Sequence, residues 1–137
     1  MSFLLDTTVL SEYTKPKPHV GLRSWLSSTV PSSLFLSTIT IFETRVGIEL
    51  MPEGKRKRLL ALWLEVDVPA VYRDRILAVD NAVADRAGRL VATARSKGWN
   101  DLEMDALIAA TASVHGMKIV TLNRKHFERL GVDLVMF

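Results

Sequence analysis

Three acidic residues occupy positions from which their carboxylates could act together on a cation. Asp6 directly follows the short apolar run 3–5, and Glu43 lies soon after a second such run, 34–36. Asp105 precedes a helical segment that is apolar almost all round. Carboxylate oxygens are the ligands that hard divalent cations such as Mg²⁺ prefer in proteins. These residues therefore point to the binding of such a cation.

Composition narrows the possible chemistry. The 137-residue chain contains no cysteine, which excludes disulfides, thiol catalysis and zinc ribbons. Its three histidines lie far apart in the sequence, at positions 19, 115 and 126, which argues against a histidine-rich zinc site. Hydrophobic residues make up 48% and charged residues 24%, as in ordinary globular domains. We expect one domain spanning 1–137, with any metal ion held by oxygen ligands.

The elements that must position the acids alternate along the chain. Short apolar runs predict buried strands at 3–5, 34–36, 76–78, 119–121 and 134–135. Helical patterns fall at 9–13, 20–28, 40–50, 59–66, 80–97, 104–115 and 123–130. Strands that alternate with helices predict a three-layer α/β fold with a central, mainly parallel, short-stranded sheet. Sites in such folds form at the carboxyl ends of the strands.

Each acid also has a purely structural interpretation. Asp6 could serve as an Asx turn or helix cap, since the residues after it can be helical. Glu43 follows Thr40 by three residues, which is the spacing of a capping box. Each position also suits an acid that faces a cation, so the structural and the functional interpretation both stay open.

Asp105 is harder to explain by capping. It borders the segment 106–112, whose apolar residues predict a buried helix. A carboxylate at the edge of such a helix loses hydration unless a cation or several donors compensate. Asn100 and Asp101 are better placed to cap that helix. We therefore interpret Asp105 as a functional acid.

Three polar residues could support these acids. Asn123 follows the strand 119–121 at the position that corresponds to Asp6 after the first strand, and it is either a ligand or a turn residue. Thr8 and Thr121 could donate hydrogen bonds that orient the carboxylates, although strand-end threonines also occur without such a role.

The charge balance favours a polyanionic partner only weakly, because the net charge is +3. A basic run opens one predicted helix, and such runs are usually solvated faces. Its alternative role is contact with RNA phosphates together with two residues near the C-terminus. The residues concerned are Lys55, Arg56, Lys57, Arg58, Arg124 and Lys125.

No segment has the features of a membrane span or of a secretion signal. Residues 24–42 carry no charge, but Pro31 and many hydroxyl residues make them a poor fit to hydrocarbon. The N-terminus lacks a basic region and has an acid at Asp6. We expect a soluble, cytoplasmic protein without membrane contact.

Taken together, four motifs resemble the PIN domain, the metal-dependent ribonuclease fold of VapC and FitB type toxins. The resemblance covers nearly the whole chain. It is carried, in the order and spacing of that family, by Leu4-Leu5-Asp6-Thr7-Thr8-Val9-Leu10-Ser11-Glu12, by Ser37-Thr38-Ile39-Thr40-Ile41-Phe42-Glu43 with Gly47, by Asp105-Ala106-Leu107-Ile108-Ala109-Ala110-Thr111-Ala112, and by Ile119-Val120-Thr121-Leu122-Asn123-Arg124-Lys125-His126-Phe127.

The resemblance implies that three acids, Asp6, Glu43 and Asp105, hold Mg²⁺ or Mn²⁺. The chain departs from the family pattern at three places. Thr8 replaces a usual Asn, and Asn123 replaces a fourth acid found in many members. His126 stands where an Asp often precedes the Phe. These changes leave fewer anionic ligands for a second ion.

The same resemblance implies a biological setting. Members of this type hydrolyse the phosphodiester bonds of RNA, such as tRNA or mRNA, by water attack and need no protein nucleophile. They act as the toxins of type II toxin–antitoxin pairs, each blocked by a small antitoxin protein, and they commonly form homodimers. We expect the same activity and partners here.

Three other functions would make different demands on these residues. A catalytically weak or inactive PIN module that binds RNA or protein is the main alternative, because Asn123 replaces an acid. A haloacid dehalogenase-type hydrolase needs a second Asp two positions after the first, where this chain has Thr8. A receiver domain would need a phosphorylated Asp after a middle strand and a lysine after the last, and neither is found.

Overall fold

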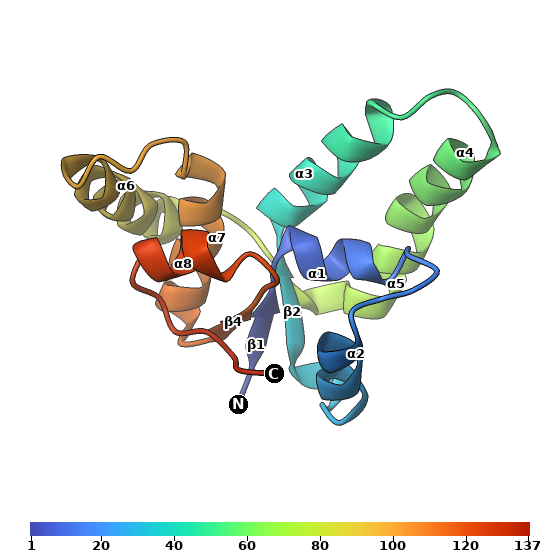
Figure 1. The fold of residues 1–137 in the computed structure, drawn as a ribbon, viewed down its shortest axis with the longest axis horizontal. Coiled ribbons are helices and arrows are strands. Elements are labelled where there is room, and N and C mark those ends of the chain that lie inside the picture. Colours follow the sequence, from blue (N-terminus) through green and yellow to red (C-terminus); the bar gives the residue numbers. More distant parts are fainter.

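The centre of the fold is a four-stranded parallel sheet (Figure 1). The computed structural model describes all residues 1–137. The strands are β1 (Phe3–Leu5), β2 (Leu34–Ser37), β3 (Ile76–Leu77) and β4 (Lys118–Val120), in the order β3-β2-β1-β4. In the register, Leu4 lies opposite Phe35 of β2 and Ile119 of β4. Because all strands are parallel, their carboxyl ends meet at one edge.

Helices cover both faces of the sheet. They are α1 (Thr7–Glu12), α2 (Val20–Ser27), α3 (Thr38–Glu49), α4 (Lys55–Leu62), α5 (Val68–Tyr72), α6 (Asn81–Ser96), α7 (Glu103–His115) and α8 (Arg124–Arg129). Figure 1 shows α6, α7 and α8 on one side of the sheet and α1 to α5 on the other. The predicted three-layer α/β fold is confirmed. None of the helices combines the length and apolar composition that crossing a bilayer requires.

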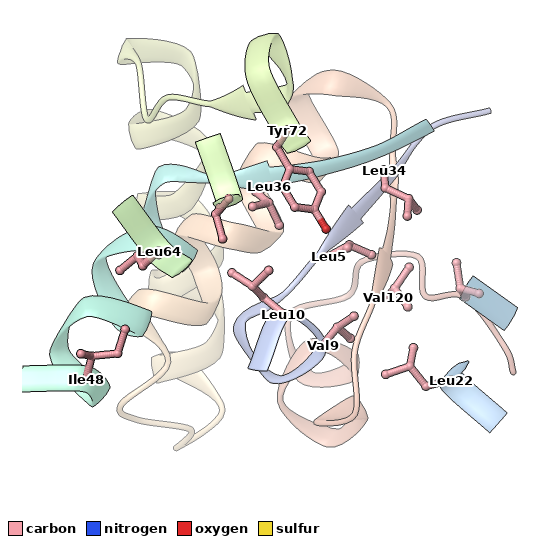
Figure 2. Packing of buried hydrophobic residues seen from close by; sticks show 12 residues of the cluster. Leu5, Val9, Leu10, Leu22, Leu34, Leu36, Ile48, Leu64, Tyr72 and Val120 are labelled. Carbon is pink, nitrogen blue, oxygen red and sulfur yellow. The ribbon is translucent and has the colours of Figure 1, made fainter. Parts of the chain in front are cut away.

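The two faces of the sheet have separate hydrophobic cores, because successive side chains of a strand point to opposite sides. Leu5 belongs to the core beneath α1 to α5, which Figure 2 shows together with Leu36 and Tyr72. Its neighbour Leu4 belongs to the opposite core with Ile119 and the helices α7 and α8. Residues 108–112 of α7 are all buried, as the alanine-rich pattern predicts.

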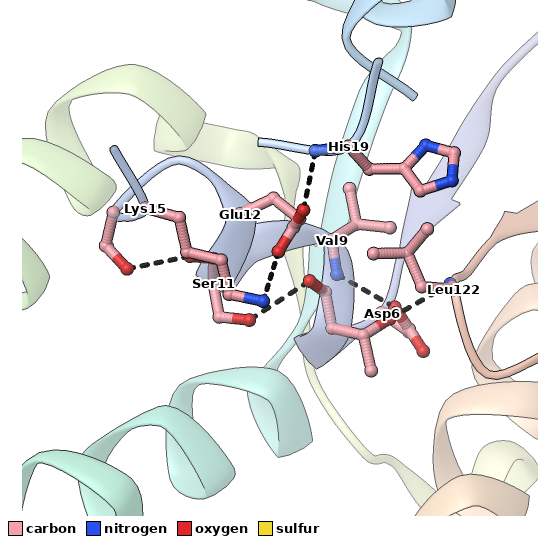
Figure 3. A network of polar contacts seen from close by, with 9 residues as sticks. Asp6, Val9, Ser11, Glu12, Lys15, His19 and Leu122 are labelled. Atoms are coloured by element: carbon pink, nitrogen blue, oxygen red, sulfur yellow. Dashed lines mark hydrogen bonds and ion pairs between the residues drawn. The ribbon is translucent and has the colours of Figure 1, made fainter. Parts of the chain in front are cut away.

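An ion pair between a buried carboxylate and a half-exposed lysine lies at the start of the loop between α1 and α2 (Figure 3). Glu12, at the end of α1, is only 5% exposed and accepts a hydrogen bond of 2.9 Å from the backbone N–H of His19. Its other oxygen lies 2.5 Å from Lys15 Nζ. These contacts lower the pKa of Glu12, and the contact with Lys15 has the largest effect. Glu12 thus keeps its negative charge despite burial, because Lys15 compensates it.

Several element boundaries differ from the prediction. The helix expected at 9–13 begins at Thr7, and the helix expected at 59–66 comprises α4 and a π-helical turn at 63–67 before α5. The last predicted strand, 134–135, is only an isolated bridge between Leu134 and Ile119.

The predicted cap of α7 is also wrong. Leu102 occupies the cap position, and no side chain caps the helix. Asp101 instead has a positive φ of 61°, and Asn100 Nδ2 contacts the Gly98 carbonyl at 3.5 Å. Glu103 and Asp105 therefore lie in the first turn of α7, where negative charge interacts favourably with the helix dipole.

Truncation of Phe127 should test how α8 is anchored. Phe127 is fully buried against the α7 side of the sheet, so Phe127→Ala leaves a cavity. We expect a loss of about 3–5 kcal/mol in unfolding free energy, measured by urea denaturation. The matched variant Phe42→Ala removes a side chain that is 55% exposed and should cost about 0.5 kcal/mol or less. Equal losses would contradict the assigned core.

Candidate functional site

The parallel sheet brings the predicted acids to one edge. Asp6 directly follows β1 and caps α1, and Asn123 is the residue at the corresponding cap position of α8. Glu43 lies in α3, which follows β2 without a gap, and Asp105 lies in the first turn of α7. Figure 1 shows the beginnings of α1 and α3 beside the upper ends of β1 and β2. The arrangement matches the rule that sites form where strands end.

Asp6 is the most deeply buried of the acids, with 3% of its surface exposed. Its Oδ1 accepts hydrogen bonds from Thr8 Oγ1 at 2.6 Å and from the Val9 N–H at 3.1 Å. Its Oδ2 accepts one from Thr121 Oγ1 at 2.5 Å. Asp6 is thus both the predicted helix cap and a carboxylate at the sheet edge (Figure 3).

Burial raises the pKa of Asp6 from 3.8 to about 6. The hydrogen bonds from Thr121, Thr8 and Val9 act in the opposite direction, while the negative charge of Asp105 adds to the rise. Asp6 and Asp105 are therefore close enough to repel each other. A cation between them would remove both causes of the rise, because it compensates the lost hydration and screens the repulsion.

The hydrogen bonds predicted for Thr8 and Thr121 are present, and their geometry explains their direction. Thr8 Oγ1 accepts from the Leu122 N–H at 3.1 Å, and Thr121 Oγ1 accepts from the Asn123 N–H at 2.8 Å. Because an ionised carboxylate can only accept, each hydroxyl directs its hydrogen to Asp6. The two threonines thereby tie the carboxylate to the β4–α8 connection.

Glu43 is held by a residue that the sequence patterns did not single out. Thr7 Oγ1 donates to Glu43 Oε1 at 2.5 Å. The capping-box interpretation that the sequence left open for Thr40 and Glu43 does not hold, since α3 begins earlier and Ser37 caps it by accepting from the Ile39 N–H. Thr7 directly follows Asp6, so this contact joins the second acid to the first.

Asp105 contacts the imidazole ring of His126. The distance between Asp105 Oδ2 and His126 Nδ1 is 2.8 Å, and Asn123 Nδ2 lies 2.9 Å from the same ring nitrogen. The Asp105 and His126 side chains are 21% and 43% exposed. Two positions at which the chain departs from the family pattern thus lie directly beside a predicted acid.

The carboxylate oxygens suit a hard cation as ligands, although the three acids do not converge on one point. No three Asp, Glu, His or Cys side chains form a cluster that could hold a metal ion in this arrangement. Asp6, Glu43 and Asp105 make no ion pair with a lysine or arginine. The one basic side chain that contacts any of these acids is His126, which lies beside Asp105. Mg²⁺ retains several waters and needs only one or two carboxylates, so Asp6 and Asp105 fit it.

The predicted basic residues lie apart from these acids. The run Lys55 to Arg58 opens α4, at the far end of the α3–α4 pair from β1 in Figure 1. Within it, Lys57 pairs with Glu53 at 2.7 Å. Arg124 donates to the Val135 carbonyl at 2.8 Å and so braces the C-terminal segment, whereas Lys125 is exposed.

The raised pKa of Asp6 predicts an unusual pH dependence of stability. The folded protein binds a proton more tightly than the unfolded chain, so Asp6 lowers stability progressively as pH rises from about 4 to about 6. In the presence of chelator, the free energy of unfolding of Asp6→Asn should rise relative to that of the unchanged protein by on the order of 2 kcal/mol between pH 4 and pH 7. Urea unfolding across this range checks the difference. A constant difference would show that the carboxylate is not desolvated.

Comparison with known proteins places this geometry in a family. The family model described as PIN domain matches residues 3–133. The chain is 34% identical over 132 residues to the VapC ribonuclease Y4jK of Sinorhizobium fredii, covering 96% of this chain and 94% of that protein. It is 34% identical over 134 residues to toxin FitB of Neisseria gonorrhoeae, covering 98% and 95%.

A solved structure agrees with the sequence comparison. The crystal structure of FitAcB from Neisseria gonorrhoeae superposes with a TM-score of 0.88 at 33% identity, covering 98% of this chain and 96% of the solved chain. Both the sheet and its helical layers are therefore shared over almost the full length. The chain belongs to the PIN domain family and is of the VapC and FitB type.

Proposed function

We propose that this protein is a metal-dependent ribonuclease and the toxin of a type II toxin–antitoxin pair. The observation that carries the proposal is the buried Asp6 carboxylate, which repels Asp105 and has no cationic side chain to compensate it. In a PIN domain of the VapC type, the missing compensation is supplied by a divalent ion. Mg²⁺ is the expected ion, and Mn²⁺ can replace it.

The side chains have separate roles in this proposal. Asp6 and Asp105 would hold the ion, which would supply a coordinated water of lowered pKa and positive charge opposite the scissile phosphate. Thr8 and Thr121 fix the orientation of the Asp6 carboxylate. Asn123 completes the ligand set or holds a ligating water.

Glu43 is the expected proton acceptor. Thr7 occupies its Oε1, so Oε2 is available either to ligate the ion or to accept a proton from the attacking water. Hydrolysis then cleaves the phosphorus–oxygen bond of the RNA backbone by water attack, and no side chain forms a covalent intermediate.

The partners follow from the relatives. VapC of Sinorhizobium fredii is named a ribonuclease and FitB a toxin, so RNA is the proposed substrate, with tRNA or mRNA as the classes to test. A cognate antitoxin, a second copy of the chain and a cytoplasmic location complete the proposal. Growth arrest on induction, relieved by a neighbouring small protein, would support the toxin role.

Two observations favour a second candidate, a PIN module that binds RNA or protein without cleaving it. Asn123 replaces an acid, and no three acids converge in the present arrangement. This candidate predicts RNA or protein binding without cation uptake. The following experiment separates the two.

Loss of Asp105 should abolish RNA cleavage. We expect the purified protein to cleave total tRNA with Mn²⁺ or Mg²⁺ and to stop in chelator. Asp105→Asn removes a ligand charge and should reduce the rate by about 100-fold or more. The control Asp85→Asn alters an exposed acid of α6 that pairs with Arg89, and should cleave normally. Equal cleavage by all variants would indicate a contaminating nuclease.

Supporting residues should have a smaller effect. Thr121→Val removes the hydrogen bond to Asp6 Oδ2 and should reduce the rate by about 10- to 100-fold. If no variant cleaves and calorimetry detects no cation uptake by the unchanged protein, the binding module is the correct interpretation.

The basic run should affect RNA affinity rather than chemistry. Replacing Lys55, Arg56 and Arg58 with Gln removes three exposed charges. In an Asp105→Asn background, we expect weaker RNA binding and a salt slope reduced by roughly 2, measured by fluorescence anisotropy. A matched triple change at Arg86 and Arg89 of α6 and at Arg23 of α2 controls for net charge. If both triple variants bind alike, the basic run is a solvated face.

A further inference from the structure

Two cationic side chains lie beside the indole ring of Trp99. Lys97 Nζ is 5.3 Å from the ring centroid, and Arg129 Cζ is also 5.3 Å from it. Both distances fall within the range of about 6 Å in which an aromatic ring attracts a cation. Neither Lys97 nor Arg129 forms an ion pair with a carboxylate. The ring thus gathers two positive charges that no acid of this chain compensates.

The end of α6 fixes where Trp99 lies. Gly98, with a φ of 80°, donates its N–H to the Arg95 carbonyl at 2.9 Å. The Trp99 N–H donates to the Ala94 carbonyl at 3.0 Å. This pair of hydrogen bonds is the Schellman motif, in which the residue after the glycine packs back on the helix. The ring accordingly packs against the core that contains Phe127, and the turn holds it next to α8.

These two cations lie close to the proposed metal site. Arg129 follows His126 by three residues in α8, so their side chains are neighbours on one face of that helix. His126 Nδ1 in turn lies 2.8 Å from Asp105 Oδ2, in the first turn of α7. Figure 1 shows α8 beside α7, and the two helices pack against each other. An anion bound by Arg129 would therefore be adjacent to one bound at the metal site.

The chemistry of this pair of cations fits phosphate groups. A guanidinium offers paired N–H donors that match two phosphate oxygens, and an ammonium is a compact donor for phosphate as well. Bound phosphates would also relieve the repulsion between Lys97 and Arg129, which share one ring without an anion. In a nucleic acid the phosphates repeat along the backbone, so a strand that enters the metal site brings neighbouring phosphates past α8.

We propose that Lys97 and Arg129, oriented by Trp99, bind backbone phosphates of the RNA substrate next to the scissile phosphodiester. The inference rests on the proposed ribonuclease function and adds a substrate-binding surface to it. Lys97 and Arg129 contact the RNA, whereas Trp99 is a positioning residue that holds both cations. Backbone contacts fix the register of a strand and carry no sequence information, so this surface sets affinity rather than the choice of bases.

RNA binding by the full-length protein tests this surface. In an Asp105→Asn background, which prevents cleavage, Lys97→Gln with Arg129→Gln should weaken binding of fluorescein-labelled tRNA about tenfold at low salt. Anisotropy across a salt series should show the salt slope reduced by roughly 1 to 2, because two phosphate contacts are lost. The matched control Arg86→Gln with Arg89→Gln neutralises two exposed arginines of α6 and should leave affinity and slope nearly unchanged.

Replacement of the ring tests its positioning role. Trp99→Leu keeps both cations but removes their contacts with an aromatic face, and should weaken tRNA binding by about three- to fivefold. Trp99→Phe retains an aromatic face and should restore most of the affinity. Urea unfolding should show that both variants remain folded. Equal affinities of the Leu and Phe variants would show that the ring does not orient the cations.

The cleavage assay separates binding from chemistry. With Asp105 intact, Lys97→Gln with Arg129→Gln should raise KM for tRNA about tenfold and leave kcat within about twofold, because neither side chain touches the reacting phosphate. A loss of kcat at unchanged KM would contradict a role in binding alone.

The outcomes distinguish this inference from the proposed function. Unchanged tRNA affinity and salt slope in the double variant would overturn the inference, as expected if the two cations serve an acidic protein partner instead. Cleavage of tRNA by the unchanged protein would still uphold the nuclease in that case. A reduced salt slope in a protein that cleaves no RNA would support the surface and refute the nuclease. If the unchanged protein neither binds nor cleaves tRNA, both proposals fail.

Discussion

The burial of the Asp6 carboxylate is the constraint on which the site and the surrounding fold both depend. Asp6 directly follows the inner strand β1, and its backbone N–H donates a hydrogen bond of 3.1 Å to the Val120 carbonyl of β4. Its side chain cannot reach bulk water, and it relies on Thr8, Val9 and Thr121 for hydrogen bonds. The chain thereby keeps a poorly compensated charge where its strands end, a cost typical of a functional site.

The same contacts connect the two layers of the molecule. Thr8 belongs to α1 on one side of the sheet, while Thr121 leads into α8 on the other. Because both hydroxyls converge on one carboxylate, a shift of either layer would disturb the orientation of Asp6. The separate hydrophobic cores on the two faces limit such shifts, since close-packed interiors deform little. Packing far from the acids therefore sets their geometry.

Sequence patterns predicted the features that depend on residues close together in the chain. The short apolar runs became β1, β2, β3 and β4, and the cap role of Asp6 was confirmed, because both depend on residues close in sequence. The capping-box alternative for Glu43 failed because Ser37 caps α3 earlier and Thr40 lies inside the helix. The contacts of Thr7 with Glu43 and of Asp105 with His126 span 36 and 21 residues, so no local pattern could reveal them.

The replacement of acids by Asn123 and His126 changes the electrostatics of the metal-free fold. Asp105 already raises the pKa of Asp6, so a further carboxylate beside them would increase the repulsion and the cost of burial. Asn123 and His126 add no further carboxylate there. His126 Nδ1 lies 2.8 Å from Asp105 Oδ2 and 2.9 Å from Asn123 Nδ2, so both residues still provide polar contacts next to Asp105. The two departures from the acidic pattern therefore limit the electrostatic cost of burying Asp6 while keeping polar partners around Asp105.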